Sequence, residues 1–104
     1  NDVITTTSFV SKFTSLQSLT LIQSDLKRIE GMDSCVVLKE LCLNDNEITS
    51  ISGLENCRNL EILEICNNKI SKLTGINGLR NLQKIWLCEN EIPTIDNLSE
   101  LPRL

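Results

Sequence analysis

Leucines recur every 22 residues along this chain, and this spacing constrains its fold more than any other feature of the sequence. The five leucines are Leu16, Leu38, Leu60, Leu82 and Leu104. The four intervals between them align position by position and share seven apolar positions. A period of this size is typical of a solenoid, in which each repeat packs only against its neighbours and buries part of one continuous core.

The consensus of the four repeats is L-x-x-L-x-L-x-x-N-x-I-x-x-I-x-G-L-x-x-[CL]-x-x. Ser24 replaces the asparagine in the first repeat, and Asn97 replaces the glycine in the fourth. They cover residues 16–37, 38–59, 60–81 and 82–103, and Leu104 opens a fifth repeat. The open end of a solenoid exposes core side chains unless a cap or a further repeat covers it. We therefore expect the native protein to continue past Leu104, or another chain to cover that end.

Within a repeat, the apolar residues at positions four and six have the period of a short strand with one buried face. Position nine holds Asn46, Asn68 and Asn90, where a buried amide can satisfy backbone groups that the turn leaves unpaired. We expect these three residues to form an asparagine ladder. Glycine at position sixteen supplies backbone freedom before the return segment. The few residues left before the next strand fit a 3₁₀ or single helical turn better than a long α-helix.

The stacked strands are expected to form a parallel sheet, which lies on the concave side because the return segments are bulkier. The L-x-x-L-x-L-x-x-N core with its I-x-x-I-x-G-L continuation resembles the leucine-rich repeats of the phosphatase-regulator type, over residues 16–104. The resemblance implies an α/β fold, a right-handed leucine-rich-repeat solenoid with a parallel concave β-sheet and short 3₁₀ or helical convex returns. It also implies a cytoskeletal, ciliary or centrosomal role, or phosphatase regulation. Bacterial internalins share the period and provide an alternative.

Residues 1–15 follow the repeat pattern only in part, with Val10 and Phe13 at positions seventeen and twenty of an earlier repeat. The hydroxyl side chains of residues 5–8 precede Phe9 and are suitable helix N-caps. We expect a short helix that caps the first repeat. The alternative is the tail of a degenerate repeat.

The five cysteines fall into two groups. Cys35 and Cys57 share the inward position twenty, where a thiol serves as a small hydrophobe, whereas Cys42, Cys66 and Cys88 lie at outward positions of the strand. A metal site is disfavoured because zinc normally takes four ligands and the chain has no histidine. Cys66 and Cys88 share one column of adjacent repeats and could approach disulfide range. The odd cysteine count without a secretion signal nevertheless favours reduced thiols in the cytosol.

Acidic side chains concentrate on the strand and on the loop that follows it. Positions two to ten of the repeats carry eight acids and three bases, within a net charge of −4. They are Asp25, Glu40, Asp45, Glu47, Glu61, Glu64, Glu89 and Glu91, against Lys39, Lys69 and Lys84. Nucleic acid is disfavoured as a partner because phosphate contacts need a basic surface. A basic segment of a protein partner is favoured, although such acids also serve simple solubility.

Trp86 is the only tryptophan, and its position in the repeat predicts an exposed indole on the concave face. Ile62, Glu64 and Lys84 occupy neighbouring columns, so this surface has the composition of an interface anchor with a charged rim. The alternative is an indole that packs over its neighbours without binding a partner. The whole predicted binding surface consists of Trp86, Ile62, Glu64, Glu40, Lys84, Cys66, Cys88, Cys42, Asn44, Asp45 and Glu89.

The sequence contains no constellation of residues that supports catalysis. It has no histidine, no phosphate-cradling glycine loop and no G-x-S-x-G or H-E-x-x-H motif. It also has no signal peptide, no apolar run of about 18 residues and no polybasic segment to direct it to a membrane. We predict a non-catalytic protein-interaction scaffold, without metal or cofactor, in the cytoplasm and in a cytoskeletal, ciliary or phosphatase-regulatory assembly. The alternatives are a purely structural segment of a longer protein and an internalin-like bacterial adhesion repeat.

Overall fold

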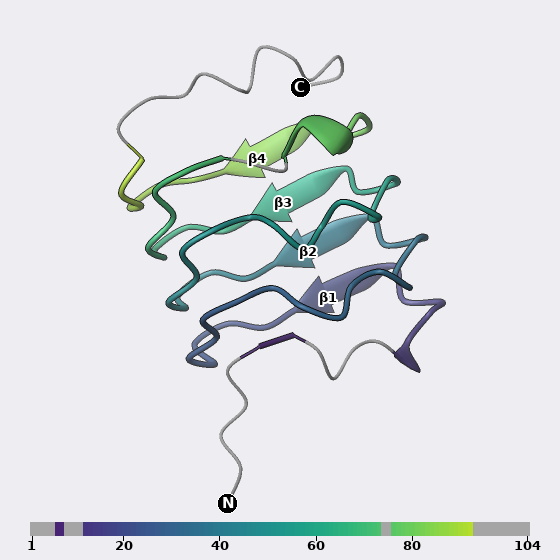
Figure 1. The fold of residues 1–104 in the computed structure, drawn as a ribbon, viewed down its shortest axis with the longest axis horizontal. Helices are drawn as coiled ribbons and strands as arrows, with labels where there is room; N and C mark the ends of the chain where they lie inside the picture. Colours follow the sequence, from purple (N-terminus) through teal and green to yellow (C-terminus); the bar gives the residue numbers. More distant parts are fainter. Residues whose placement is uncertain (1–5, 8–11, 74–75, 93–104) are drawn as a thin grey trace, which may run out of the picture.

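Four short strands stack into one parallel sheet in the computed structural model, which describes residues 6–7, 12–73 and 76–92. The strands follow the chain order and are drawn as successive layers in Figure 1. They are β1 (Ser18–Thr20), β2 (Glu40–Cys42), β3 (Ile62–Glu64) and β4 (Lys84–Trp86). The chain is therefore built from one strand and one return segment per repeat.

The register of the sheet is the register of the sequence repeat. Leu41 of β2 pairs with Leu19 of β1 and with Leu63 of β3, and each partner lies 22 residues away in the sequence. Leu63 in turn pairs with Ile85 of β4. A shift of one residue would turn every inward leucine outward, so the buried column fixes which residues of neighbouring repeats lie side by side.

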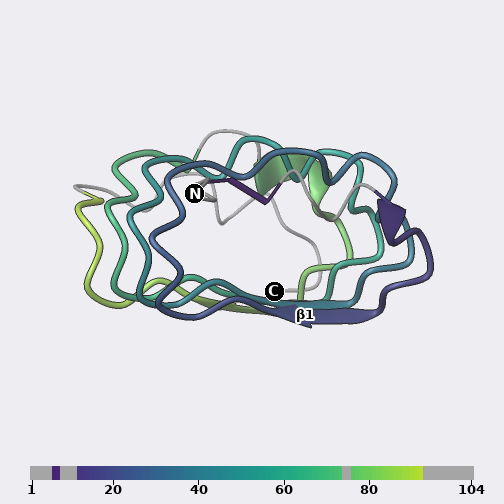
Figure 2. The ribbon, with the colours of Figure 1, turned by 90° about the horizontal axis from the view of Figure 1, so that it is seen from below.

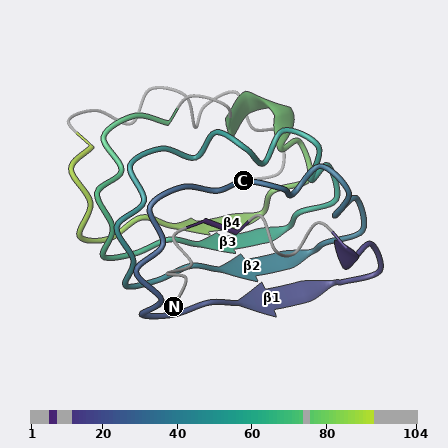
Figure 3. The ribbon, with the colours of Figure 1, turned by 60° about the horizontal axis from the view of Figure 1, so that its bottom comes forward.

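The core fills the space between the sheet and the return segments. Figure 2 shows each repeat as a flattened coil with the strand along one side and the return along the other, and Figure 3 shows the strands side by side beneath the returns. Leu63 of β3 and Ile76 of the following return are both fully buried. At the first and last described repeats, the inward residues Leu19 and Ile85 are only partly buried, because each has a neighbouring repeat on one side in the described part of the chain.

The return segments turn through short-range backbone hydrogen bonds. Cys35 N–H donates to Met32 O (3.0 Å), and Cys57 N–H donates to Leu54 O (3.0 Å) at the same position of the next repeat. The third return contains η2 (Ile76–Gly78), a single 3₁₀ turn. Helical returns as a general feature and the right-handed coiling remain predictions of the sequence.

Gly53, at position sixteen of the second repeat, is required for a steric reason as well as a conformational one. Gly53 has φ of 109°, in the left-handed region. A Cβ atom built there would collide with the carbonyl oxygen of Ile29 in the preceding repeat. Gly31 has φ of 72°, so both described glycines at this position use the backbone freedom that the sequence suggested.

Residues 6 and 7 continue the 22-residue spacing one repeat before Leu16. Thr6 pairs in parallel with Arg28, as Ser50 pairs with Lys72 later in the chain. Thr7 is fully buried, and its hydroxyl donates to Glu30 O (2.6 Å) and accepts from Glu30 N–H (2.8 Å). These contacts tie Thr7 to the first repeat, while the choice between a capping helix and a degenerate repeat stays a prediction. Phe9 and Val10, on which the capping helix also rested, lie outside the described residues.

No helix in the described ranges is long and apolar enough to cross a membrane.

Candidate functional site

The outward sheet face is formed by the side chains at positions three, five and seven of each repeat. Position three contributes Ser18, Glu40, Ile62 and Lys84, position five contributes Thr20, Cys42, Glu64 and Trp86, and position seven contributes Ile22, Asn44, Cys66 and Cys88. The strand register places the members of the first two columns on adjacent strands. Nine of the eleven residues predicted to bind a partner lie on this face: Trp86, Ile62, Glu64, Glu40, Lys84, Cys66, Cys88, Cys42 and Asn44.

Trp86 is the most exposed large apolar side chain of the outward sheet face, with 53% of its surface accessible. Its register partner on β3 is Glu64, and the partner of Lys84 is Ile62, which is half-buried. The structure therefore brings together the indole, one apolar neighbour, one acid and one base on two adjacent strands. This is the arrangement that the sequence predicted around Trp86.

Two predicted residues, Asp45 and Glu89, lie at the edge where the strands end rather than on the outward sheet face. Both occupy position eight with positive φ, 62° and 56°. Asp45 accepts a hydrogen bond from Asn67 Nδ2 (2.8 Å) and lines an open hollow of about 410 Å³ together with Asp25 and other residues. The acids at this edge form a surface next to the outward sheet face and do not belong to it.

The charges differ between the outward sheet face and its edge. Glu47, at the edge, forms ion pairs with Lys27 (3.1 Å) and Lys69 (3.9 Å). The hydrogen bond and the charge of Lys27, with the charge of Lys69, lower the pKa of Glu47. On the outward sheet face, Glu40 and Glu64 form no ion pair with any described residue. These two carboxylates are open to a partner.

Asn44 orients one of these carboxylates. Its Nδ2 donates to Glu64 Oε1 (3.3 Å), and its Oδ1 accepts from the backbone N–H of Cys66 (2.7 Å). The amide is held at both ends, so the Glu64 side chain is positioned over β2 and β3 instead of moving freely in solvent. Asn44 supports the surface in addition to contributing to it.

Cys66 and Cys88 are joined by a disulfide between adjacent repeats. The prediction of reduced thiols is wrong for this pair. Residues in one column of neighbouring strands are one strand spacing apart, and the Cα atoms of this pair are 4.7 Å apart, within the usual range for disulfides. The prediction relied on an expected reducing cytosol and gave less weight to the short distance between the two cysteines.

The other cysteines lie as their columns predicted. Cys35 and Cys57 are fully buried, whereas Cys42 is half-buried on the outward sheet face. Burial raises the pKa of Cys35 and, more strongly, the pKa of Cys57, to about 12. Both buried thiols therefore stay neutral and unreactive at ordinary pH. No group of three or more Cys, Asp, Glu or His side chains among the described residues is arranged to hold a metal ion.

The asparagines at position nine connect neighbouring repeats through their side chains. Asn46 Nδ2 donates to Leu21 O (2.8 Å) in the preceding repeat and to Leu43 O (3.0 Å) in its own. Its Oδ1 accepts from the backbone N–H groups of Ser24 and Leu26, both at 3.0 Å. This network satisfies backbone groups at the strand end that would otherwise be buried without partners.

The same network recurs in the next repeats. Asn68 Nδ2 donates to Leu43 O (2.9 Å) and its Oδ1 accepts from Ile48 N–H (3.0 Å). Asn90 Nδ2 donates to Ile65 O (2.8 Å) and its Oδ1 accepts from Ile70 N–H (2.9 Å). Each of the three side chains thus links its own repeat to the preceding one, and together they hold the strand ends in line.

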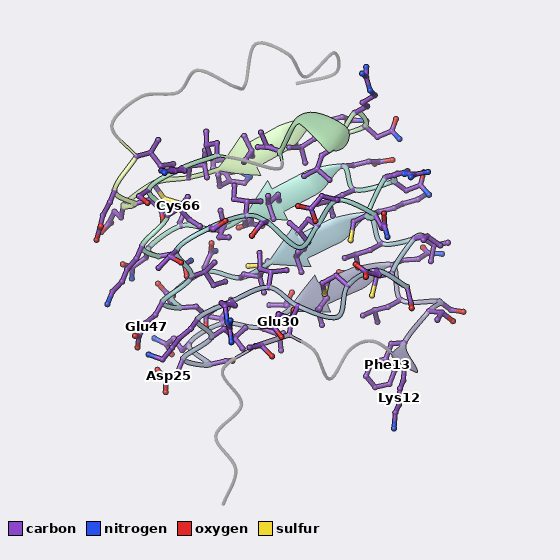
Figure 4. All side chains as sticks on the ribbon, in the orientation of Figure 1. Lys12, Phe13, Asp25, Glu30, Glu47 and Cys66 are labelled. Atoms are coloured by element: carbon purple, nitrogen blue, oxygen red, sulfur yellow. A yellow bond between two sulfur atoms is a disulfide. The ribbon has the colours of Figure 1, made fainter. Side chains whose placement is uncertain are left out.

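A second row of asparagines, at the edge where the strands begin, was missed from the sequence. Asn59 Nδ2 donates to Val36 O, and Asn81 Nδ2 donates to Arg58 O, both at 2.7 Å. Asn59 and Asn81 are 22 residues apart at the last position of their repeats, and this recurrence was the available signal. The two edges are separated in Figure 4, where Phe13 marks the start of the strands and Cys66 and Glu47 mark their end.

Residues 36–78 match the family model described as leucine-rich repeats in two copies. The search of curated proteins finds no significant match. Among solved structures, an internalin (inlF) from Listeria monocytogenes is similar, with 28% sequence identity and a TM-score of 0.82 over 98% of this chain and 30% of that one. Internalin C2 from the same organism has 20% identity and a TM-score of 0.74, over 97% of this chain and 54% of that one.

The chain therefore spans about a third of the first internalin and about half of the second. The fold is one that typically serves as a non-enzymatic protein-interaction scaffold. The finer assignment to the phosphatase-regulator class has no support from these similarities. Residues 36–78 carry leucine-rich repeats, and the described residues have a repeat fold similar to the solved structures of two internalins.

Proposed function

We propose that the chain is a non-catalytic scaffold that docks a protein partner on the outward sheet face. The observation that carries this proposal is the exposed indole of Trp86 beside Glu64 and Ile62. Binding energy at protein interfaces concentrates in a few aromatic and charged residues at the centre of the contact. An exposed tryptophan on a rigid sheet has the geometry of such an anchor.

The partner has a basic segment in this proposal and is neither nucleic acid nor a membrane. Glu40 and Glu64 form no ion pair with a described residue, and Lys84 is the single base among the described residues of the outward sheet face. Complementary charge increases the rate of encounter and disfavours wrong partners. Asp45 and Glu89 at the neighbouring edge extend the same negative field.

A cytoplasmic location, in a cytoskeletal, ciliary or phosphatase-regulatory assembly, is the narrower part of the proposal. It rests on the resemblance of the repeat pattern alone. A purely structural role within a longer chain is the competing possibility, and it predicts that changes on the outward sheet face have no effect on binding.

A second candidate function is an adhesion repeat like those of bacterial internalins. Two observations favour it: the similarity to the internalin inlF and the Cys66–Cys88 disulfide. Disulfides persist in oxidising environments outside the cytosol. Alkylating the thiols of the protein inside its native cells and comparing gel mobility with and without reduction separates the two locations. A mobility shift that requires reduction supports the adhesion repeat, and full alkylation without reduction supports the cytoplasm.

The docking surface is tested by the double substitution Trp86→Ala and Glu64→Lys. Both residues are outward, so the melting temperature should change little while capture of every partner is lost. The matched control is Phe13→Ala with Asp33→Lys, because Phe13 is 52% exposed but lies at the start of the strands, and Asp33 is exposed on a return segment. If the binding partners are retained by the first variant, the docking surface lies elsewhere.

A further inference from the structure

A small hollow on the outward sheet face gives the docking surface a specific shape. It has a volume of about 110 Å³ and lies over β1, β2 and β3. The side chains around it are Ser18, Thr20, Glu40, Cys42, Ile62 and Glu64. The backbone of the two inward leucines between them, Leu19 and Leu41, forms its floor.

The size of the hollow decides what can enter it. Ligand pockets for whole small molecules measure about 300 to 1,000 Å³, so this hollow of about 110 Å³ is too small for such a ligand. A water molecule occupies about 30 Å³ of liquid. The hollow therefore holds a few waters or the head group of one long side chain that projects from a partner.

The chemistry around the hollow selects a cation with several hydrogen-bond donors. Glu40 and Glu64 contribute a carboxylate each from adjacent strands, and neither forms an ion pair in the described part of the chain. Ser18 and Thr20 add hydroxyl acceptors. Lys84, the base of this face, is not among the lining residues. A guanidinium group has five N–H donors in a planar fork and uses such a set of acceptors more fully than an ammonium group.

The surface beside the hollow is apolar. Ile62 forms part of its wall, and Trp86 lies next to Glu64 on the neighbouring strand. Adjacent strands are about 4.8 Å apart, whereas side chains two residues apart on an extended segment point the same way at about 7 Å. An extended segment that places one side chain in the hollow can thus place its next side chain on the same side over the indole.

We infer that the outward sheet face binds an extended protein segment of the form Arg-x-apolar, with the arginine between Glu40 and Glu64 and the apolar side chain on Trp86. This inference rests on the proposed docking function and specifies its partner chemistry. The guanidinium replaces water in the hollow and neutralises the two carboxylates. The apolar residue covers the exposed indole, which is the largest apolar area on this face.

The probe is a set of four capped peptides that differ in one residue each. The parent peptide is Ser-Arg-Ser-Leu-Ser, and the other peptides replace arginine with lysine, arginine with glutamine, or leucine with alanine. Each is titrated into the ¹⁵N-labelled chain, and the amide signals of Cys42 and Glu64 and the indole signal of Trp86 are followed. The parent peptide should shift all three signals, the glutamine peptide should lose the amide shifts, and the alanine peptide should lose the indole shift.

The variant Glu40→Gln with Glu64→Gln should weaken binding of the parent peptide about tenfold, which corresponds to about 1.4 kcal/mol. The control variant Asp33→Asn with Glu91→Gln removes the same charge away from the hollow and should bind as the unchanged chain does. Melting curves of both variants check that the fold is intact. Equal weakening in both variants, or equal affinity for the arginine and glutamine peptides, overturns the inference.

The outcome of this experiment is independent of the test of the proposed function. If the peptides fail to bind but partner capture still depends on Trp86, the docking surface stands and the Arg-x-apolar chemistry is wrong. If the arginine peptide binds in the hollow but Trp86→Ala with Glu64→Lys leaves partner capture intact, the proposed function is wrong.

Discussion

The two faces of the sheet differ in how much their residues vary between repeats, although the same short strands form both. On the inward face, Leu41 and Leu63 are identical in neighbouring repeats and almost completely buried. On the outward sheet face, the residues that flank them change from Glu40 and Cys42 in β2 to Ile62 and Glu64 in β3. The inward residues maintain the stack, so each repeat needs an apolar residue at these positions. The outward residues are free to vary, and a binding specificity can be built only where repeats differ.

The largest effect that separates the two faces is expected from adjacent residues of β3. Leu63→Ala should lower the free energy of unfolding by about 3 to 5 kcal/mol, because it leaves a cavity beneath the middle of the sheet. Ile62→Ala, one residue earlier and half-buried on the outward sheet face, should cost less than about 1 kcal/mol. Urea unfolding measures both. Equal losses would mean that the outward sheet face carries stability too.

The two edges of the sheet give the next comparison. Asn68 is 6% exposed and its amide makes four hydrogen bonds, to Ile48 N–H and to three carbonyl groups. Asn68→Ala should therefore cost about 3 kcal/mol, because buried backbone groups lose their partners. Asn59 makes one exposed bond to Val36 O, so Asn59→Ala should cost about 1 kcal/mol or less. A large loss in both variants would show that the two asparagine rows are equivalent.

The disulfide is the one outward feature expected to contribute substantially to stability. It joins residues 22 apart, and a closed loop of this length stabilises a fold by about 3 kcal/mol, mainly by restricting the unfolded chain. Cys66→Ser with Cys88→Ser should lower the urea midpoint accordingly, with unchanged circular dichroism. Cys42→Ser is the control, since Cys42 is a free thiol on the same face. If reduction of the unchanged protein does not move the midpoint, the bond contributes nothing to stability.

Thiol reactivity gives the smallest and most local comparison of the inward and outward columns. At pH 8, an aromatic disulfide reagent should label Cys42 in the native chain and reach Cys35 and Cys57 only after unfolding.

The pKa of Cys57 is raised to about 12 by burial, above the ordinary thiol value. A raised thiol pKa adds stability below its unfolded pKa, and this stability is lost as pH rises between the two values. Unfolding free energy measured above pH 9 should therefore decline, and a flat profile in this range would contradict the assignment.

The sequence repeat was sufficient to predict the strands, their parallel order and the inward columns. These follow from one periodic constraint, because a leucine that repeats every 22 residues must meet its equivalent in the next layer. The same register places Trp86, Ile62 and Glu64 on one surface. Whether that surface binds a partner remains a prediction, since the repeat pattern encodes the scaffold and not its ligand.

Backbone conformations and buried polar contacts were harder to predict than the apolar columns. Position eight is left-handed in all four repeats, with φ of 55° at Gln23 and 56° at Glu89, although neither residue type favours that conformation. The strand-end hydrogen bonds impose it on whichever residue stands there. Thr7 occupies an apolar column because its hydroxyl is bonded on both sides to Glu30, a compensation that hydrophobic patterning does not reveal.

The disulfide also determines how this chain responds to mechanical tension. A solenoid pulled along its stacking axis releases its layers one after another, because each layer holds only its neighbours. The Cys66–Cys88 bond encloses 22 residues of chain, and at about 3.4 Å per extended residue this segment would otherwise lengthen by about 75 Å. Under oxidising conditions the intact disulfide carries the force, and the enclosed segment does not extend. Adding a reductant releases it as one discrete step, so the redox state of one pair of cysteines sets the extensibility of the stack.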